Sequence, residues 1–254
     1  MRVADVRIPQ AGPCSASRRA PSLVTRHSSL VTQMSEAKAL MTAWTHVAPG
    51  REEEFNAWYD TEHVPDIVAL PGFLLGRRYA CDGATPKYLA WYDTVDEHVE
   101  PGPHLQKYIA DQTPGFRRMS AFLQHRERMN FRLMRDVGDT SRADAPWLYI
   151  VHTDIPDHIA GEYNEWYDRE HLPRLATVPG VLRARRYNRV SGPGPQYLTA
   201  YELTDAEVWE SPAAHQARKT PWTEKMRSLF QNTRRSMCKL ILPSVLHAAR
   251  SGKA

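Results

Sequence analysis

The sequence lacks any long apolar run, and it lacks the short motifs that identify most cofactor and nucleotide sites. No apolar stretch approaches the ~20 residues that a membrane-spanning helix requires, so we expect no membrane association. The sequence holds no GxGxxG, Walker, GxSxG, HExxH or HxH pattern. These absences leave nucleotide cofactors and covalent acyl chemistry without support, and we expect no metal site.

Cysteine is scarce, and its spacing fits neither a zinc site nor a disulfide framework. The three cysteines are Cys14, Cys81 and Cys238, which lie far apart and form no CxxC pair. Domains that are stapled by disulfides carry many closely spaced cysteines. The pattern therefore favours reduced thiols in a cytoplasmic protein.

The net charge of +4 comes from the N-terminal segment rather than from the body of the chain. Residues 1–33 hold five arginines and one aspartate, whereas the rest holds 28 basic and 28 acidic side chains. A balanced body offers no broad basic face, so we expect no nucleic-acid partner. Residues 1–36 are predicted to be a disordered extension and residues 246–254 a flexible tail.

One polar and aromatic motif occurs twice. EFNAWYDTEHVP (54–65) returns as EYNEWYDREHLP (162–173), with eight of twelve positions identical and a separation of 108 residues. A period of this length indicates a duplicated domain rather than a solenoid unit. We place the two repeats at residues 37–140 and 145–245. The same spacing aligns LPGFLLGRRY (70–79) with VPGVLRARRY (178–187), Arg126 with Arg234, and Met129 with Met237.

Each repeat has the pattern βαββαβ, the ferredoxin-like split unit. A short apolar strand comes first, at 39–47 or 147–154, and a helix follows across the motif, interrupted by Pro65 or Pro173. Such a unit carries helices on one face of its sheet and leaves the other face bare. We therefore predict an α+β protein in which two ferredoxin-like repeats pack their bare faces together as an intramolecular dimeric α/β barrel.

The repeated motifs carry a resemblance to a known family. WYDTEHVP and WYDREHLP, followed by LPGF or VPGV and then RRY, resemble EthD-type members of the dimeric α/β-barrel superfamily. Members usually build the barrel from two chains, and the tandem form departs from that. The resemblance implies many activities, among them cyclases, decarboxylases, lactone isomerases, quinol monooxygenases and haem-handling relatives.

The repeated helix offers a candidate acid–base group. Asn56, Asp60 and His63 follow the spacing i, i+4, i+7 and are expected on one stripe. An acid before a histidine can orient the imidazole and favour its protonated form. A surface pair that only ties the helix to the scaffold remains the alternative. The second repeat places Asn164, Asp168 and His171 in the same pattern, and the candidates for catalysis are His63, His171, Asp60 and Asp168.

Alternation along the RRY strands predicts which side chains line the barrel. Arg77 and Tyr79 are expected to point inward, and Arg78 is expected to pair with Glu62 on the helix side. A guanidinium and a phenol in a cavity suit a carboxylate or enolate ligand. The candidates for substrate binding are Arg77, Arg185, Tyr79, Tyr187, Trp44, His152, Asn56 and Asn164.

The function that fits these residues is a cofactor-independent lyase or isomerase acting by histidine acid–base catalysis. Its substrate would be a small, partly aromatic or lactone-like metabolite that undergoes decarboxylation, isomerisation, cyclisation or bond cleavage. The alternatives are a haem-binding or haem-dependent barrel, although no sequence feature demands haem, and a non-catalytic ligand-binding or structural barrel. Further homo-oligomerisation is left open.

Overall fold

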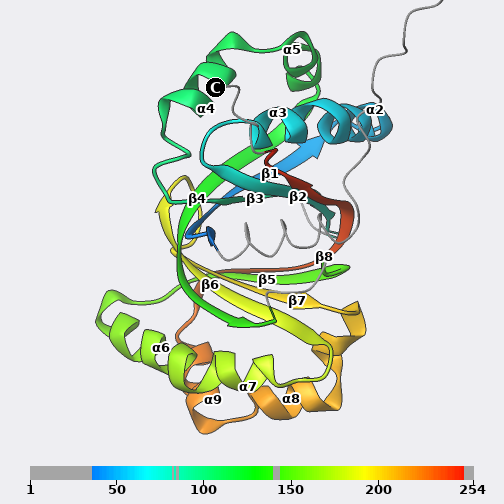
Figure 1. Ribbon diagram of the computed structural model, residues 1–254. Helices are drawn as coiled ribbons and strands as arrows, with labels where there is room; N and C mark the ends of the chain where they lie inside the picture. The colour runs from blue at the N-terminus through cyan, green and yellow to red at the C-terminus, as the bar shows by residue number, and fades with distance from the viewer. Residues whose placement is uncertain (1–35, 82, 84–85, 140–143, 249–254) are drawn as a thin grey trace, which may run out of the picture.

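The computed structural model describes residues 36–81, 83, 86–139 and 144–248. Within these residues, eight antiparallel strands close into a barrel in the order β1-β3-β2-β8-β5-β7-β6-β4. Helices cover β1–β4 at one end of the molecule and β5–β8 at the other, as Figure 1 shows. The predicted α+β fold with a barrel formed inside one chain is confirmed. The extension predicted at 1–36, apart from Glu36, lies outside the described residues. Cys14 and residues 249–254 lie outside them as well.

The elements follow the same order twice, and we call them the first half (β1–β4) and the second half (β5–β8). No helix within the described ranges is long and apolar enough to cross a membrane. The strands are β1 (Ala39–Val47), β2 (Phe73–Ala80), β3 (Tyr88–Thr94), β4 (Leu123–Gly138), β5 (Trp147–Asp154), β6 (Val181–Ser191), β7 (Tyr197–Leu203) and β8 (Gln231–Leu246). The helices are α2 (Glu52–Trp58), η1 (Tyr59–His63), α3 (Val64–Val68), α4 (Pro103–Asp111), α5 (Pro114–Ser120), η2 (Asp157–Ile159), α6 (Ala160–Trp166), η3 (Tyr167–His171), α7 (Leu172–Ala176), η4 (Ala206–Glu210), α8 (Pro212–Arg218) and α9 (Pro221–Ser228).

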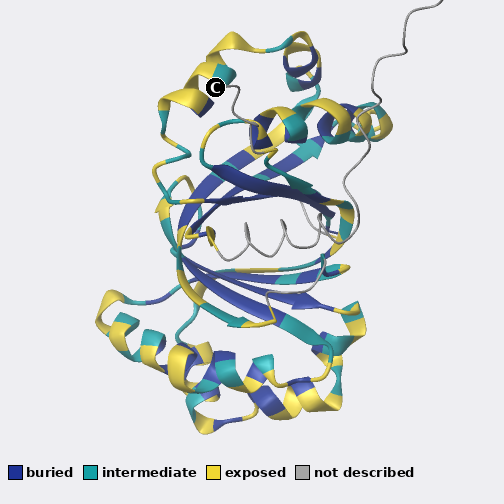
Figure 2. Cartoon of the chain, in the orientation of Figure 1, coloured by how far each residue is buried: buried dark blue, intermediate teal, exposed yellow. Residues whose placement is uncertain are grey.

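Each sheet is buried on both faces, which explains why β3 and β7 are apolar over nearly every residue. Tyr88, Ala90 and Tyr92 of β3 pack under the helices, whereas Leu89 and Trp91 join the cluster inside the barrel. Figure 2 shows the strands dark where they face one another and the helices exposed on their outer sides. The interior is therefore filled by side chains that alternate with those under the helices.

The inward orientation predicted for the RRY strands is correct. Tyr79 and Tyr187 belong to the buried cluster inside the barrel, together with Trp91. On the opposite face, a Cβ on Gly76 would lie 2.9 Å from side-chain atoms of Val64 and Val68, so the helix sits directly on β2 there. Close approach of this kind requires a residue without a side chain.

Four buried charges join the two halves at the inside of the barrel. Asp93 accepts a hydrogen bond from Arg77 of its own half at 2.8 Å and from Arg185 of the other half at 2.8 Å. Arg185 also pairs with Glu202 at 2.7 Å, and Arg77 lies 3.8 Å from Glu202. Burial alone would raise the pKa of Asp93, but Arg185 and Arg77 outweigh burial and hold that pKa below its usual value. The network keeps Asp93 charged inside the protein.

Replacing Asp93 with Asn should destabilise the protein strongly, because both arginines would lose their shared anion in a place that water does not reach. We expect the free energy of unfolding in urea to fall by about 3–5 kcal/mol. Glu54→Gln is the matched control, since it breaks the exposed pairs with Arg51 and Arg118 and should change stability by less than about 1 kcal/mol. Equal effects of the two substitutions would contradict the structural role of the network.

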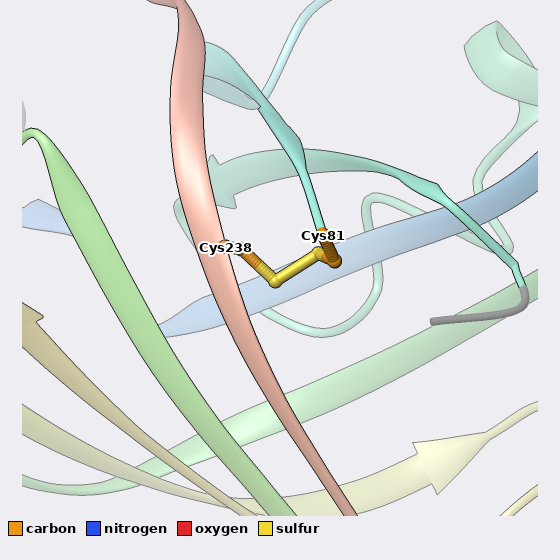
Figure 3. Close-up of a disulfide and its surroundings, with 2 residues drawn as sticks. All are labelled: Cys81 and Cys238. Carbon is orange, nitrogen blue, oxygen red and sulfur yellow. A yellow bond between two sulfur atoms is a disulfide. The ribbon is translucent and has the colours of Figure 1, made fainter. Parts of the chain in front are cut away.

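A disulfide between Cys81 and Cys238 contradicts the prediction of reduced thiols. Cys81 directly follows β2 and Cys238 lies in β8, and these two strands are neighbours at one of the two seams between the halves. Figure 3 shows the bond crossing from one strand to the other. No pattern in the sequence indicates this pair, because 157 residues separate the cysteines and only the closure of the barrel brings them together.

Thiol titration of the chain unfolded in denaturant without reductant should detect one free cysteine, Cys14, rather than three. Replacing both Cys81 and Cys238 with Ser should lower the free energy of unfolding by about 2–4 kcal/mol, because the unfolded chain loses a long cross-link. Detection of three thiols in protein purified without reductant would show that the bond does not form.

Candidate functional site

In both halves, the repeated motif contains a π-helical turn just before its proline, and the helix continues beyond that proline. The amide of Val64 donates to the carbonyl of Tyr59, five residues back, and Leu172 does the same to Tyr167. A proline in an α-helix lacks a donor and clashes with the carbonyl four residues earlier. The wider turn avoids this conflict just before Pro65, so α2, η1 and α3 run on as one helix. The helix break predicted at Pro65 and Pro173 is therefore wrong, and π-turns of this kind are frequent at functional sites.

The π-turn also changes which side chains share a face. Asp60 forms an ion pair with Arg78, whose other terminal nitrogen donates to Asn56 at 2.7 Å. His63 is rotated away from this group and stacks on Trp58. The predicted pairs Asp60–His63 and Arg78–Glu62 are both wrong, because the expected stripe assumed a regular α-helix.

The second half repeats part of this arrangement. Arg186 donates to Asn164 at 2.6 Å, as Arg78 does to Asn56. Asp168 is exposed. Glu170, for which an arginine partner was predicted, accepts a hydrogen bond from Thr220 at 2.5 Å. Neither aspartate of the motif therefore contacts the histidine that follows it.

His63 lines a small cavity between the sheet and the helices of the first half. The cavity has a volume of about 60 Å³ and opens toward a surface cleft of about 310 Å³. His63 stacks on Trp58 with ring centres 4.7 Å apart and meets Tyr59 edge-on at the same distance. Four residues border both spaces and form the passage between them: Ile109, Phe116, Leu123 and Arg126.

Tyr108 of α4 fixes the imidazole from the opposite side of the cavity. Its hydroxyl lies 3.0 Å from Nδ1 of His63 and donates to Asp66 at 3.5 Å. Burial raises the pKa of Tyr108, and the neighbouring Asp66 raises it further. The phenol therefore stays protonated and serves as a hydrogen-bonding link between the carboxylate and the imidazole.

The imidazole of His63 is neutral at physiological pH, contrary to the prediction that its setting favours the cation. Burial lowers the pKa of His63 to about 3, and Arg78 and Arg126 contribute in the same direction. The expected carboxylate partner, Asp60, is turned to Arg78. A neutral imidazole with one nitrogen held by Tyr108 leaves Nε2 as the nitrogen that a ligand could reach.

The corresponding space in the second half is filled. Tyr149, which aligns with cavity-lining Met41, stacks on Trp209 with ring centres 4.0 Å apart. The guanidinium of Arg218 lies over the same indole at 4.4 Å. His171 stacks on Trp166 at 4.2 Å, and its Nδ1 has no hydrogen-bond partner among the described residues. Because α8 carries no tyrosine, the His63–Tyr108 contact has no counterpart there.

The other predicted binding residues lie on the barrel side of the sheets, away from both histidines of the motif. Trp44 and His152 contact each other edge-on with ring centres 6.0 Å apart. Arg77 and Arg185 are occupied by Asp93 and Glu202. A sheet therefore separates these barrel-side residues from the catalytic candidates, and only Asn56 and Asn164 among the predicted binding residues lie on the helix side with them.

Sequence reasoning missed the residues that complete the cavity, above all Tyr108 and Arg126. Tyr108 comes from a helix outside the repeated motif, so no spacing links it to His63. The alignment of the last strands was also wrong by one residue. Ala43 pairs with Arg128 while Val151 pairs with Arg235, which makes Arg235 the counterpart of Arg128.

Comparison with known proteins shows the fold. A scan of protein-family models finds no match to the sequence, and a search of curated proteins finds none either. The crystal structure of an anthrone oxidase-like protein is similar with a TM-score of 0.62 and 10% identity, over 86% of this chain and 97% of that one. A putative monooxygenase from Lactobacillus acidophilus NCFM gives a TM-score of 0.55 at 10% identity, over 84% and 100%. A putative chlorite dismutase gives 0.52 at 12% identity, over 80% and 95%. The chain has the dimeric α/β-barrel fold.

The described part of the chain holds no group of three His, Cys, Asp or Glu side chains placed to bind a metal ion. Single histidines are the remaining candidates for a metal-containing group. His63 and His171 are both packed against a tryptophan ring.

Stability should fall as the pH drops below neutrality, because three buried histidines resist protonation. Burial lowers the pKa of His63, His152 and His171 to about 3 in the folded protein. The unfolded chain takes up these protons near pH ~6.5 and so binds more protons than the folded chain between pH ~6.5 and 3. The free energy of unfolding in urea should therefore decrease steadily from pH 7 to pH 4. His171→Phe should reduce this slope, and an unchanged slope would show that His171 titrates normally.

Proposed function

We propose that the protein is a cofactor-independent enzyme that removes a proton from a small aromatic ketone or phenol at His63 in the first half. The observation that supports this most directly is the neutral imidazole of His63, which faces a cavity and is held by Tyr108. Lyase or isomerase chemistry follows from such a proton transfer. We also propose that the chain is an EthD-like, tandem-duplicated barrel, since the same π-turn occurs at the same place in both copies of the motif.

The hydrogen-bond chain determines which nitrogen of His63 acts as the base. Tyr108 has one proton and donates it toward Asp66. Nδ1 of His63 must then be the donor to the phenol oxygen, which leaves a lone pair on Nε2. A base of this kind takes a proton from a carbon that is next to a carbonyl group, or conjugated with it through an aromatic ring, and leaves the electron pair on the oxygen as an enolate.

Arg126 is placed to stabilise the negative charge that forms. It lies at the passage between cavity and cleft and makes no ion pair among the described residues. Arg126 also lowers the pKa of His63, after burial and Arg78. An oxyanion beside Arg126 would offset that charge, so His63 would become more basic as the substrate becomes anionic.

The dimensions and lining of the site suit a flat, apolar substrate. The walls include Trp58, Phe116, Leu105 and Ile109. A ring could occupy the surface cleft while its reacting carbon reaches His63. The similar fold of an anthrone oxidase-like protein supports this substrate class, because the methylene carbon of an anthrone is acidic through conjugation with the ketone across the aromatic rings.

Haem, which the sequence left as an alternative, is not used by this proposal. The cavity next to His63 holds about 60 Å³, so a larger group such as haem would have to occupy the adjoining cleft of about 310 Å³. Trp58 covers one face of the imidazole and Tyr108 holds Nδ1, which would leave Nε2 to bind an iron. No step of the proposed reaction involves haem or any other cofactor.

Hydrogen–deuterium exchange at the methylene carbon of anthrone tests the proposal directly. In anaerobic deuterium oxide buffer, the native protein should accelerate loss of the methylene signal in proton NMR. His63→Gln should slow this exchange by about 10²–10⁴-fold, the usual contribution of a general base. His171→Gln is the matched control, because it removes the same residue from the filled second half and should leave the rate within about twofold of the native value.

Tyr108→Phe separates positioning from packing. It removes the hydroxyl that holds Nδ1 of His63 but keeps the ring, so exchange should slow while the melting temperature changes little. Equal rates for native protein, His63→Gln and His171→Gln would contradict the proposed base. Binding of anthrone without any acceleration of exchange would favour a non-catalytic ligand-binding barrel.

A further inference from the structure

A second hollow lies on the second half, and basic side chains surround it. This cleft has a volume of about 470 Å³ and is open to solvent between β8, η4, α8 and α9. Four of its nine lining residues are basic: Arg218, Lys219, Arg227 and Arg235. Two acids, Glu210 and Glu224, lie at the same cleft, so the cations outnumber the carboxylates. We call it the basic cleft.

None of these four cations forms an ion pair with a carboxylate of the described chain. Glu210, at the same cleft, binds His215 at 3.1 Å instead. The buried Arg183, by contrast, is paired with Asp136 at 2.5 Å, whereas the buried Arg186 is held by Asn164. The unpaired cations of the basic cleft therefore form a local excess of positive charge in a protein whose body is otherwise balanced.

The buried position of Arg218 shows that this excess of positive charge is part of the folded structure. Its side chain is only 6% exposed, lies over the indole of Trp209 at 4.4 Å, and donates to Nδ1 of His215 at 3.2 Å. A buried guanidinium that makes no ion pair is unfavourable. Burial lowers the pKa of Arg218 and Arg227 lowers it further, and the charge of Glu210, which acts in the opposite direction, does not offset them. An anion bound in the cleft would supply the missing partner.

The first half neutralises the matching position and the second half does not. Arg128, the counterpart of Arg235 in the sheet register, is bound by Glu100 at 2.8 Å. Arg235 and Arg227 are exposed at the cleft without such a carboxylate. The two halves thus differ in whether a carboxylate neutralises this one arginine.

We propose that the basic cleft is a binding site for a small molecule that carries two or more negative charges on oxygen, such as a phosphate ester or a polycarboxylate. Arginine forks bind phosphate and carboxylate oxygens in the same bidentate geometry, so the cleft recognises their shared chemistry. Tyr149 and Trp209 stack on each other in the wall of the cleft, and His171 is not among its lining residues. The site is independent of the reaction proposed at His63.

Isothermal titration calorimetry at low ionic strength tests the site with two probes, inorganic pyrophosphate and citrate. The double variant Arg227→Gln/Arg235→Gln removes two exposed cations and should weaken binding by at least about tenfold, or ~1.4 kcal/mol, because the charge-assisted hydrogen bonds of both guanidinium groups are lost. Arg117→Gln/Arg135→Gln is the control with the same charge change on the first half. It should leave the affinity within about twofold of the native value.

The comparison of probes identifies the ligand class. Preference for pyrophosphate indicates phosphate esters, and preference for citrate indicates polycarboxylates. Equal loss of affinity in both double variants would show that binding follows net charge, which would overturn the site. Failure of the native chain to bind either probe would overturn it as well. Unchanged melting temperatures of the variants would show that their effects arise in binding.

Discussion

The barrel depends on a buried ion network that neither half can complete alone. Asp93 of the first half is shared by Arg77 and Arg185, and Glu202 completes the set from the other side. Buried charges are tolerated only when each has a partner in good geometry. Separating the halves would leave an arginine without its full set of anions, so the network specifies how the two sheets meet as well as favouring their association.

The fold could be predicted from the sequence because its signals are local or repeated. Three signals constrain the architecture separately and agree with the structure. They are the period of 108 residues, the βαββαβ order, and the alternation around Arg77 and Tyr79. The disulfide could not be predicted in this way. Its two cysteines become neighbours only after β2 and β8 meet, and no periodicity records that event.

The site was predicted in part, and the π-turn explains why the partner of His63 was predicted wrongly. His63 does line a cavity, but its partner is Tyr108 rather than Asp60. The π-turn adds one residue to a helical turn and thereby moves Asp60 and His63 onto different faces. Helical spacing rules assume a constant turn, and proline two residues after the histidine was the only sequence sign that the turn would widen. The contrast between a cavity in one half and the Tyr149–Trp209 stack in the other depends on residues outside the motif.

The covalent link at the seam has a consequence for how copies of the chain can assemble. Once Cys81 and Cys238 are joined, β3 to β7 lie within one closed loop of the polypeptide. Two oxidised molecules cannot exchange halves, because the Cys81–Cys238 bond of each chain would first have to break. Oxidation therefore keeps the two halves of each chain together as one barrel, so that a larger assembly would form between the outer surfaces of intact barrels.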